Sequence, residues 1–429
     1  MKNILYTLLL LGFLNVKAQN TAVDKIDSLL TYLEKNNKFK GSVTLLEGEK
    51  ELISKSYGEE NKENNILKVG SITKSFTAVL VLKLIEDKKL ELSTKLATFY
   101  PKIKNAETIT IEDLLHHQSG IPDYVNQYTV TAADYAKGPI QDVILENINS
   151  YESLFEPKSQ FLYSNTNYFL LGKIVEELNG KPYAFLIENR IAKRLRLQNT
   201  FYPTSIEQVK QKVTPSFELE EDKWYPVKTD DYEVAFAAGG ICSTTKDIAV
   251  FYKNLMEGKL LKPESVLLLK EIEHGYGLGI MRFPFGERQF FGHGGKIENY
   301  NSTAGYYPKD KLSIAVIANA GDYTLNDIVI GVLSIYYKMP YRFPEFKKID
   351  AKLVSKYSGV YATPLMPMKI TVFEKAGQFF GQGTGQPEFP LTQIDDTTFE
   401  FPQAHLELKF NDKGMILTQN GQKVIFTKE

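Results

Sequence analysis

The stretch from Gly70 to Ile85 reads Gly-Ser-Ile-Thr-Lys-Ser-Phe-Thr-Ala-Val-Leu-Val-Leu-Lys-Leu-Ile, and its residues 72–85 predict a helix that is buried on nearly every side. Ser71 and Lys74 are three residues apart, so they share one face of this helix. A lysine in apolar surroundings has a lowered pKa and can take a proton from a neighbouring hydroxyl. A serine at the helix start also places a developing oxyanion near the positive end of the helix dipole. The stretch therefore predicts a serine nucleophile activated by a lysine.

The same Ser-x-x-Lys spacing occurs at Ser243 to Lys246. There the segment is polar, and Thr244-Thr-Lys-Asp247 is typical of a capping box that opens a helix stopping at Gly258. Helix capping explains this second copy without chemistry. Ser71 is therefore the candidate nucleophile.

Two further polar segments follow along the chain. Tyr163-Ser-Asn165 precedes an amphipathic helix, of which either Asn165 or Thr166 could be the N-cap. Gly292-His293-Gly294-Gly295 stands at the end of the strand Gln289-Phe-Phe291, where glycines indicate close approach of another chain segment or a ligand to the backbone. Taken alone, each segment also fits a purely structural role.

The order Ser71-x-x-Lys74, Tyr163-x-Asn165, His293-x-Gly295 resembles that of the serine β-lactamase and penicillin-binding-protein superfamily. The branch in question holds class C β-lactamases, D-Ala-D-Ala carboxypeptidases, D-aminopeptidases and lactamase-like esterases. The resemblance covers residues 25–335 and includes four supporting segments: Leu114-Leu-His-His-Gln-Ser-Gly-Ile-Pro-Asp-Tyr124, Tyr163-Ser-Asn-Thr-Asn-Tyr-Phe-Leu-Leu-Gly172, Gly239-Gly-Ile-Cys-Ser-Thr-Thr-Lys-Asp-Ile-Ala249 and Tyr276-Gly-Leu-Gly279.

The resemblance implies an α/β (α+β) fold of the β-lactamase/transpeptidase type. In this three-layer fold an antiparallel sheet is flanked by helices and carries an inserted helical lobe. The residue patterns agree with it: they predict a helix near 23–33, a hairpin of strands 41–46 and 52–57, helices with long loops over 90–260, and strands at 302–307 and 312–318.

The resemblance also implies roles for the first two motifs. Ser71 would be the acylated nucleophile and Lys74 its partner in deprotonation. Tyr163 would pass a proton to the leaving group, with a phenol pKa lowered by nearby cationic charge. Asn165 would orient Lys74 and bind the substrate amide.

The third motif would complete the substrate site with His293 and Gly295. The backbone N–H groups of Ser71 and Lys296 would form the oxyanion hole. His293 stands where many class C β-lactamases have the lysine of Lys-Thr-Gly, a sequence that this chain lacks. Histidine there is typical of carboxypeptidase-like, D-aminopeptidase-like and esterase-like members. With an ordinary pKa near 6.5, it would hold a substrate carboxylate less well as the pH rises through its titration.

The remaining chain divides by composition. Residues 1–18 are predicted to be a signal peptide, with Lys2, an apolar run from Ile4 to Leu14 and cleavage after Ala18. Residues 19–338 would be the hydrolase domain, and 339–346, with two prolines, a linker. Alternating strands predict a small antiparallel all-β domain over 347–429, in which Gly381-Gln-Gly-Thr-Gly385 indicates a hairpin because no helix follows it.

The amino-acid composition limits the classes of ligand and partner that the protein is expected to bind. The chain carries 51 basic and 52 acidic residues without long runs of one sign, which argues against binding to nucleic acid. One cysteine and no His-Glu-x-x-His or Walker sequence argue against a metal site or a nucleotide loop, so no cofactor is expected. The expected partner is a small-molecule or peptide substrate, with no stable membrane insertion.

The sequence thus predicts a periplasmic or secreted serine hydrolase that acts through a covalent Ser71 intermediate. Its substrates would be amide bonds of D-amino-acid peptides or cell-wall fragments. Two alternatives stay open: a carboxylesterase or weak β-lactamase of the same fold, and a non-catalytic penicillin-binding sensor. The complete set of Ser71, Lys74 and Tyr163 favours an enzyme over a sensor.

Overall fold

The computed structural model describes residues 22–61, 64–220, 223–229, 232–346, 350–375, 378–386, 388–401, 404, 406–419 and 421–429. The predicted signal peptide, residues 1–18, lies outside these ranges. The chain forms two compact units, of which the first ends at Tyr336 and the second runs from Tyr337 to Glu429. Within the described ranges, no helix combines the length and the apolar character needed to cross a membrane.

The first unit is built on an antiparallel sheet with the strand order β2-β1-β10-β9-β8-β7. Two strands come from the start of the chain and four from the end of the unit. Their bounds are β1 (Lys40–Glu47), β2 (Lys50–Tyr57), β7 (Met281–Phe285), β8 (Arg288–Ile297), β9 (Tyr300–Tyr307) and β10 (Leu312–Ala320). The predicted hairpin and the two predicted C-terminal strands are confirmed.

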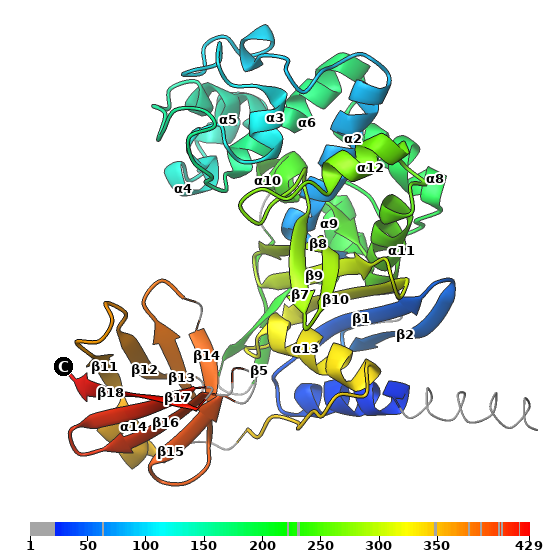
Figure 1. Ribbon diagram of the computed structural model, residues 1–429. Coiled ribbons are helices and arrows are strands. Elements are labelled where there is room, and N and C mark those ends of the chain that lie inside the picture. Colours follow the sequence, from blue (N-terminus) through cyan, green and yellow to red (C-terminus); the bar gives the residue numbers. More distant parts are fainter. Residues whose placement is uncertain are drawn as a thin grey trace, which may run out of the picture. The chain divides into compact units, whose positions relative to one another are not determined.

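Helices cover both faces of this sheet. A helix over residues 22–35 and α13 (Leu325–Tyr336) lie on one side, and α11 (Thr245–Met256) packs on the other (Figure 1). Because both faces are covered, every residue of β10 is buried. The three layers are those expected, although the sequence patterns did not assign α13.

A helical lobe is inserted between β2 and β7 (Figure 1). Its central helix is α2 (Thr73–Glu86), in which all residues but Lys83, Ile85 and Glu86 are buried, as predicted. The 3₁₀ turn η1 (Gly70–Ile72) leads into it. The other elements are β3 (Leu67–Lys68), η2 (Leu96–Thr98), α3 (Ile111–Leu115), α4 (Tyr124–Gln127), η3 (Asp134–Ala136), α5 (Ile140–Ile148), α6 (Asn165–Asn179), α7 (Tyr183–Leu186), the π-helical turn η4 (Ile187–Ala192), α8 (Lys193–Leu195), α9 (Ile206–Lys212), β4 (Phe217–Glu220), β5 (Lys223–Pro226), α10 (Tyr232–Gly239), β6 (Cys242–Ser243) and α12 (Pro263–Leu269).

The second unit is a closed antiparallel barrel. Its strands are β11 (Gly359–Ala362), β12 (Ile370–Lys375), β13 (Gln378–Gly383), β14 (Glu388–Gln393), β15 (Thr398–Phe401), β16 (Leu406–Asn411), β17 (Gly414–Gln419) and β18 (Gln422–Lys428). Closure removes exposed strand edges. The predicted all-β character and the hairpin at Gly381–Gly385 are confirmed, whereas the short helix α14 (Ala351–Tyr357), capped by Asp350, was not predicted.

A buried ion pair joins two parts of the first unit. Lys68 on β3 directly precedes the segment that enters η1, and Glu298 lies in the turn between β8 and β9. The two side chains are only 4% and 1% exposed. Removing one member of such a pair leaves the other charge buried without its counterion, which is strongly destabilising.

We predict that Lys68→Met lowers the free energy of unfolding of the first unit by about 3–5 kcal/mol. Lys193→Met is a matched control, since Lys193 pairs with Glu188 at 63% and 56% exposure, and an exposed pair contributes less than about 1 kcal/mol. Urea unfolding followed by fluorescence of Trp224, the one tryptophan of the chain, measures both. Equal losses in the two variants would contradict the prediction.

Candidate active site

Ser71 and Lys74 meet where η1 passes into α2. The Lys74 Nζ lies 3.0 Å from the Ser71 Oγ, 2.7 Å from the Asn165 Oδ1 and 2.8 Å from the backbone oxygen of Ala238. The Lys74 side chain has no exposed surface. Three segments that are far apart in the sequence thus enclose one amine.

Burial lowers the pKa of Lys74 to about 7, and the negative charge of Asp123 opposes that shift. A substantial fraction of Lys74 is therefore a neutral amine near pH 7. A neutral amine has two hydrogens and one lone pair. The oxygens of Asn165 and Ala238 can only accept, so they take the two hydrogens and leave the lone pair directed at the Ser71 hydroxyl.

Asn165 is the first residue of α6, and its N-cap is Ser164 rather than Asn165 or Thr166. The Asn165 side chain is therefore available to the site. Its Nδ2 donates to the Asp123 Oδ2 at 2.8 Å, which directs Oδ1 toward Lys74. Asp123 thus fixes the orientation of the amide that contacts the amine.

The Tyr163 ring lies beside the amine, with the Lys74 Nζ 4.8 Å from its centroid. Burial raises the pKa of the Tyr163 phenol well above its ordinary value, and the hydrogen bond with Ser71 only partly offsets this. The expectation of a lowered phenol pKa is therefore wrong. Its premise was a permanent cation nearby, but burial itself disfavours the charge on Lys74.

His117 packs against Tyr163, with ring centroids 4.3 Å apart. Its Nδ1 accepts from the backbone N–H of Ser164 at 3.2 Å and lies 3.2 Å from the Asn167 Nδ2. Burial holds the pKa of His117 well below its ordinary value, so the ring is neutral. Its position is that of a support for the Tyr163 ring.

His293 is placed differently from the expectation. It lies inside β8, not at a strand end, and its side chain is 3% exposed. The Nε2 is 3.0 Å from the Tyr276 hydroxyl, and the Nδ1 contacts the backbone oxygen of Gly294. Burial lowers its pKa to about 3, followed by a smaller effect of Lys74. His293 therefore stays neutral near pH 7, and the expected histidine titration there is wrong.

The predicted oxyanion donors lie on adjacent backbone segments. A Cβ on Gly295 would lie 2.8 Å from the Ser71 nitrogen and 2.2 Å from the Val69 oxygen, and a Cβ on Gly70 would lie 2.9 Å from the Lys296 nitrogen. The Ser302 hydroxyl on β9 donates to the same Val69 oxygen at 2.7 Å. Only glycine at position 295 permits β8 to approach η1 this closely.

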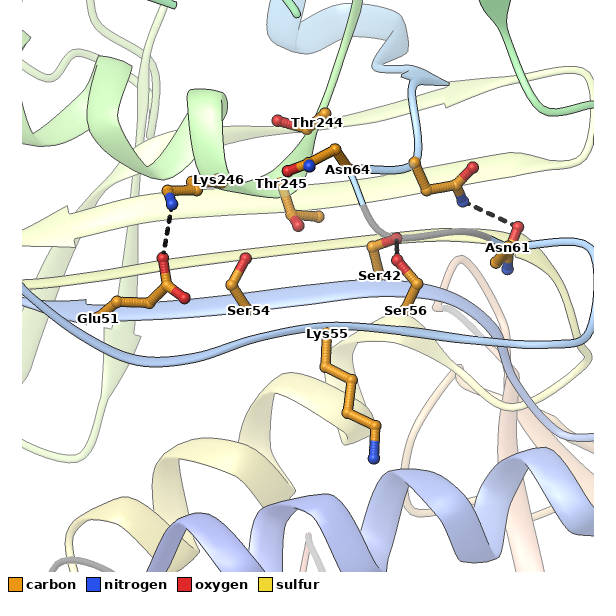
Figure 2. Close-up of a pocket in the computed structure, with 11 residues that line it drawn as sticks. Ser42, Glu51, Ser54, Lys55, Ser56, Asn61, Asn64, Thr244, Thr245 and Lys246 are labelled. Atoms are coloured by element: carbon orange, nitrogen blue, oxygen red, sulfur yellow. Dashed lines mark hydrogen bonds and ion pairs between the residues drawn. The ribbon is translucent and has the colours of Figure 1, made fainter.

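The second Ser-x-x-Lys segment lies apart from this arrangement. The Ser243 Oγ is 2.7 Å from the Thr200 Oγ1, and Thr244 caps α11 by accepting from the Asp247 N–H at 3.1 Å, as predicted. Lys246 pairs with Glu51 at 2.9 Å on the rim of a polar pocket beside β1 and β2 (Figure 2). The structure thus separates Ser243 from Lys246.

The sequence motifs supplied Ser71, Lys74, Tyr163 and Asn165, which come together, and Gly295 and Lys296, whose backbone borders Ser71. Sequence reasoning missed Asp123. The signal available was that Asp123 is the one acidic residue in the segment Leu114–Tyr124. Among the residues with described positions, no three His, Cys, Asp or Glu side chains are grouped so that they could hold a metal ion.

The chain is similar in sequence to a known hydrolase and in fold to two solved structures. A teichoic acid D-alanine hydrolase from Staphylococcus aureus (strain MRSA252) is 27% identical over 255 residues, which is 57% of this chain and 61% of that protein. A D-stereospecific amidohydrolase from Streptomyces sp. has a TM-score of 0.61 at 26% identity, covering 73% of this chain and 98% of that one. The octameric penicillin-binding protein homologue from Pyrococcus abyssi has a TM-score of 0.66 at 23% identity and covers 94% of this chain and 99% of that one.

The family model described as Beta-lactamase matches residues 27–328. This span contains β1 to β10, and with them the serine, lysine, tyrosine and asparagine described above. Since it is well over half of the chain, the protein is a hydrolase with the β-lactamase fold and belongs to the beta-lactamase family.

Proposed function

We propose that the protein hydrolyses amide bonds of D-amino-acid peptides or cell-wall fragments by acyl transfer through Ser71, outside the cytoplasm. The observation that carries the proposal is the buried Lys74 amine, whose other two partners leave its lone pair for the Ser71 hydroxyl. The names of two relatives, a teichoic acid D-alanine hydrolase and a D-stereospecific amidohydrolase, support D-configured substrates. The predicted signal peptide supports export.

In acylation, the Ser71 hydroxyl gives its proton to Lys74 while Oγ attacks the substrate carbonyl carbon. The backbone N–H groups of Ser71 and Lys296 stabilise the oxyanion that forms. The tetrahedral intermediate collapses and the bond to the leaving nitrogen breaks. Tyr163 is a neutral phenol because of its raised pKa, so it donates its proton to that nitrogen and regains one from the Lys74 ammonium.

In deacylation, the same groups act on a water molecule. Water gives a proton to Tyr163 while Tyr163 passes its own to the neutral Lys74 amine, and the water oxygen attacks the Ser71 ester carbonyl. Collapse releases the acid and returns the proton to the Ser71 Oγ, as microscopic reversibility requires. A binding sensor would gain nothing from keeping a buried amine next to this hydroxyl, since burying it disfavours its charge.

The neutral His293 of the third motif argues against the alternative that the protein is an efficient β-lactamase. A neutral His293 that is turned to Tyr276 provides no cation for the carboxylate of a β-lactam. Efficient antibiotic hydrolysis is therefore not part of the proposal. An esterase of the same fold would use the same mechanism, and turnover of short p-nitrophenyl esters without any turnover of D-amino-acid amides would favour it.

The first prediction of this mechanism concerns the nucleophile. A fluorophosphonate probe should label the tryptic peptide Val69–Lys74, which contains Ser71, and Ser71→Ala should abolish the label. Ser243→Ala, the control at the second Ser-x-x-Lys, should leave labelling intact. Mass spectrometry of the digested protein measures both. A label on the peptide that carries Ser243 would refute the assignment.

The second prediction concerns the proton path. Lys74→Met and Tyr163→Phe should each lower kcat at least about a hundredfold, because general acid–base groups contribute roughly 10²–10⁴-fold. Tyr252→Phe is the matched control. The Tyr252 hydroxyl, on α11, lies 2.8 Å from the hydroxyl of Ser75, which is on α2 next to Lys74. Steady-state rates on one ester substrate measure all three. Losses below about threefold at both Lys74 and Tyr163 would place the proton path elsewhere.

The third prediction concerns pH. Lys74 has a lone pair only when deprotonated, so kcat/KM on an uncharged ester should rise with pH through an inflection at about 7 and then level off. His293, with a pKa lowered to about 3, is neutral throughout this range and should not contribute. Profiles of the wild type and of His293→Gln should therefore share one inflection. Loss of the inflection in His293→Gln would show that histidine carries the titration.

A further inference from the structure

We propose that the Asp123 carboxylate binds the free α-ammonium group of the substrate, so that the enzyme releases N-terminal D-aminoacyl groups rather than C-terminal residues. This inference rests on the proposed function and names the substrate class within it. It concerns a residue to which neither the sequence motifs nor the mechanism above gives a substrate contact.

Asp123 is held at the start of α4 with its carboxylate directed at the active site. Its Oδ1 accepts from the Val125 N–H at 3.1 Å as the helix cap, and its Oδ2 accepts from the Asn165 Nδ2 at 2.8 Å. A carboxylate has about four acceptor positions, so these two bonds leave capacity for a further donor. The side chain is partly exposed, which gives a ligand access.

The Asp123 carboxylate has no salt-bridge partner among the described residues. Within the described ranges no lysine, arginine or histidine nitrogen forms a salt bridge with Asp123. Its negative charge nevertheless acts on the reacting groups. It opposes the lowering of the Lys74 pKa by burial, and it adds to the raised pKa of the Tyr163 phenol, of which burial is the main cause. A carboxylate that lies beside the reacting groups and forms no salt bridge with a described residue favours a cation from the substrate.

The spacing suits an amino group next to the reacting carbonyl. Asp123, Asn165, Lys74 and Ser71 form a continuous chain of contacts of 2.8, 2.7 and 3.0 Å. In a D-aminoacyl compound the nitrogen is only two bonds from the carbonyl carbon that Ser71 would attack. The Asn165 amide joins Asp123 to Lys74, so a nitrogen on the Asn165 side of that carbon lies toward the Asp123 carboxylate, to which an ammonium can donate a charge-assisted hydrogen bond.

Along the described part of β8, no buried cation is available to hold the carboxylate of a C-terminal residue. His293 is neutral and turned to Tyr276. Lys296, the next cation along β8, has an exposed side chain, and solvent and salt screen its attraction. A substrate that carries a free carboxylate would also meet repulsion from Asp123. The charges of the site thus favour a free amine over a free acid.

The test compares D-alanine p-nitroanilide with its N-acetyl derivative at pH 7, where an α-amino group is largely charged. Wild type should show a higher kcat/KM on the free amine. Asp123→Asn keeps the shape and the capping oxygen, removes the charge and replaces the oxygen that accepts from Asn165 by an N–H donor, so both kcat/KM values should fall. Their ratio should also fall, roughly 10–100-fold, because only the free amine loses a charged partner. Asp142→Asn, an exposed carboxylate on α5, is the matched control and should leave the ratio unchanged.

Three results would overturn the inference: no preference for the free amine in wild type, no turnover of either anilide, or equal losses on both anilides in Asp123→Asn. The last would make Asp123 a positioning residue that acts through Asn165. Fluorophosphonate labelling of the same samples separates this from failure of the proposed function. If Ser71 is labelled but the enzyme shows no preference for the free amine, only the proposed ammonium site is refuted. If Ser71 is not labelled, its proposed role as the nucleophile is refuted as well.

Discussion

The burial of the Lys74 amine among three oxygen atoms is the constraint on which the active site depends. An ammonium group excluded from water is costly, so burial shifts its pKa toward neutrality. The Asn165 and Ala238 oxygens then decide where the remaining lone pair points. The reactivity that we propose for Ser71 depends on this arrangement and not on the serine itself, because Ser243, which also precedes a lysine by three residues, has a threonine hydroxyl as its partner.

The fold buries the Lys74 amine by packing segments that are distant in the sequence against one buried helix, α2. The interior position of α2 keeps water from Lys74, while α6 and the end of α10 supply its two acceptors. On the other side, β8 approaches η1 closely enough that any side chain at Gly295 would collide with the Val69 oxygen. The Lys68–Glu298 pair connects the segment before η1 with the turn after β8. The backbone N–H groups of Ser71 and Lys296, the predicted oxyanion donors, therefore belong to two segments, η1 and β8, whose relative position is fixed by the close approach at Gly295 and by the ion pair.

Two expectations about ionisation failed for the same physical reason. Tyr163 was expected to have a lowered pKa and His293 an ordinary one, but burial raises the first and lowers the second. Both shifts disfavour a charge in a dry environment. The consequence is a site in which Tyr163 and His293 are neutral near pH 7 and Lys74 is partly so, while Asp123 carries the negative charge that acts on Lys74 and Tyr163. This electrostatic balance points to the ammonium of a D-aminoacyl substrate rather than to a carboxylate.

The sequence by itself determined the buried helix with Ser71 and Lys74, the order of the three motifs and the all-β character of the C-terminal unit, because these depend on local periodicity and spacing. By its resemblance to known proteins, it also indicated the family. It did not determine the pairing of Asp123 with Asn165, the burial of His293 or the pKa directions. Those depend on contacts between residues far apart in the chain: Lys74 meets acceptors 91 and 164 positions away. Desolvation and hydrogen-bond direction are properties of the packed neighbourhood, so only the tertiary structure decided them.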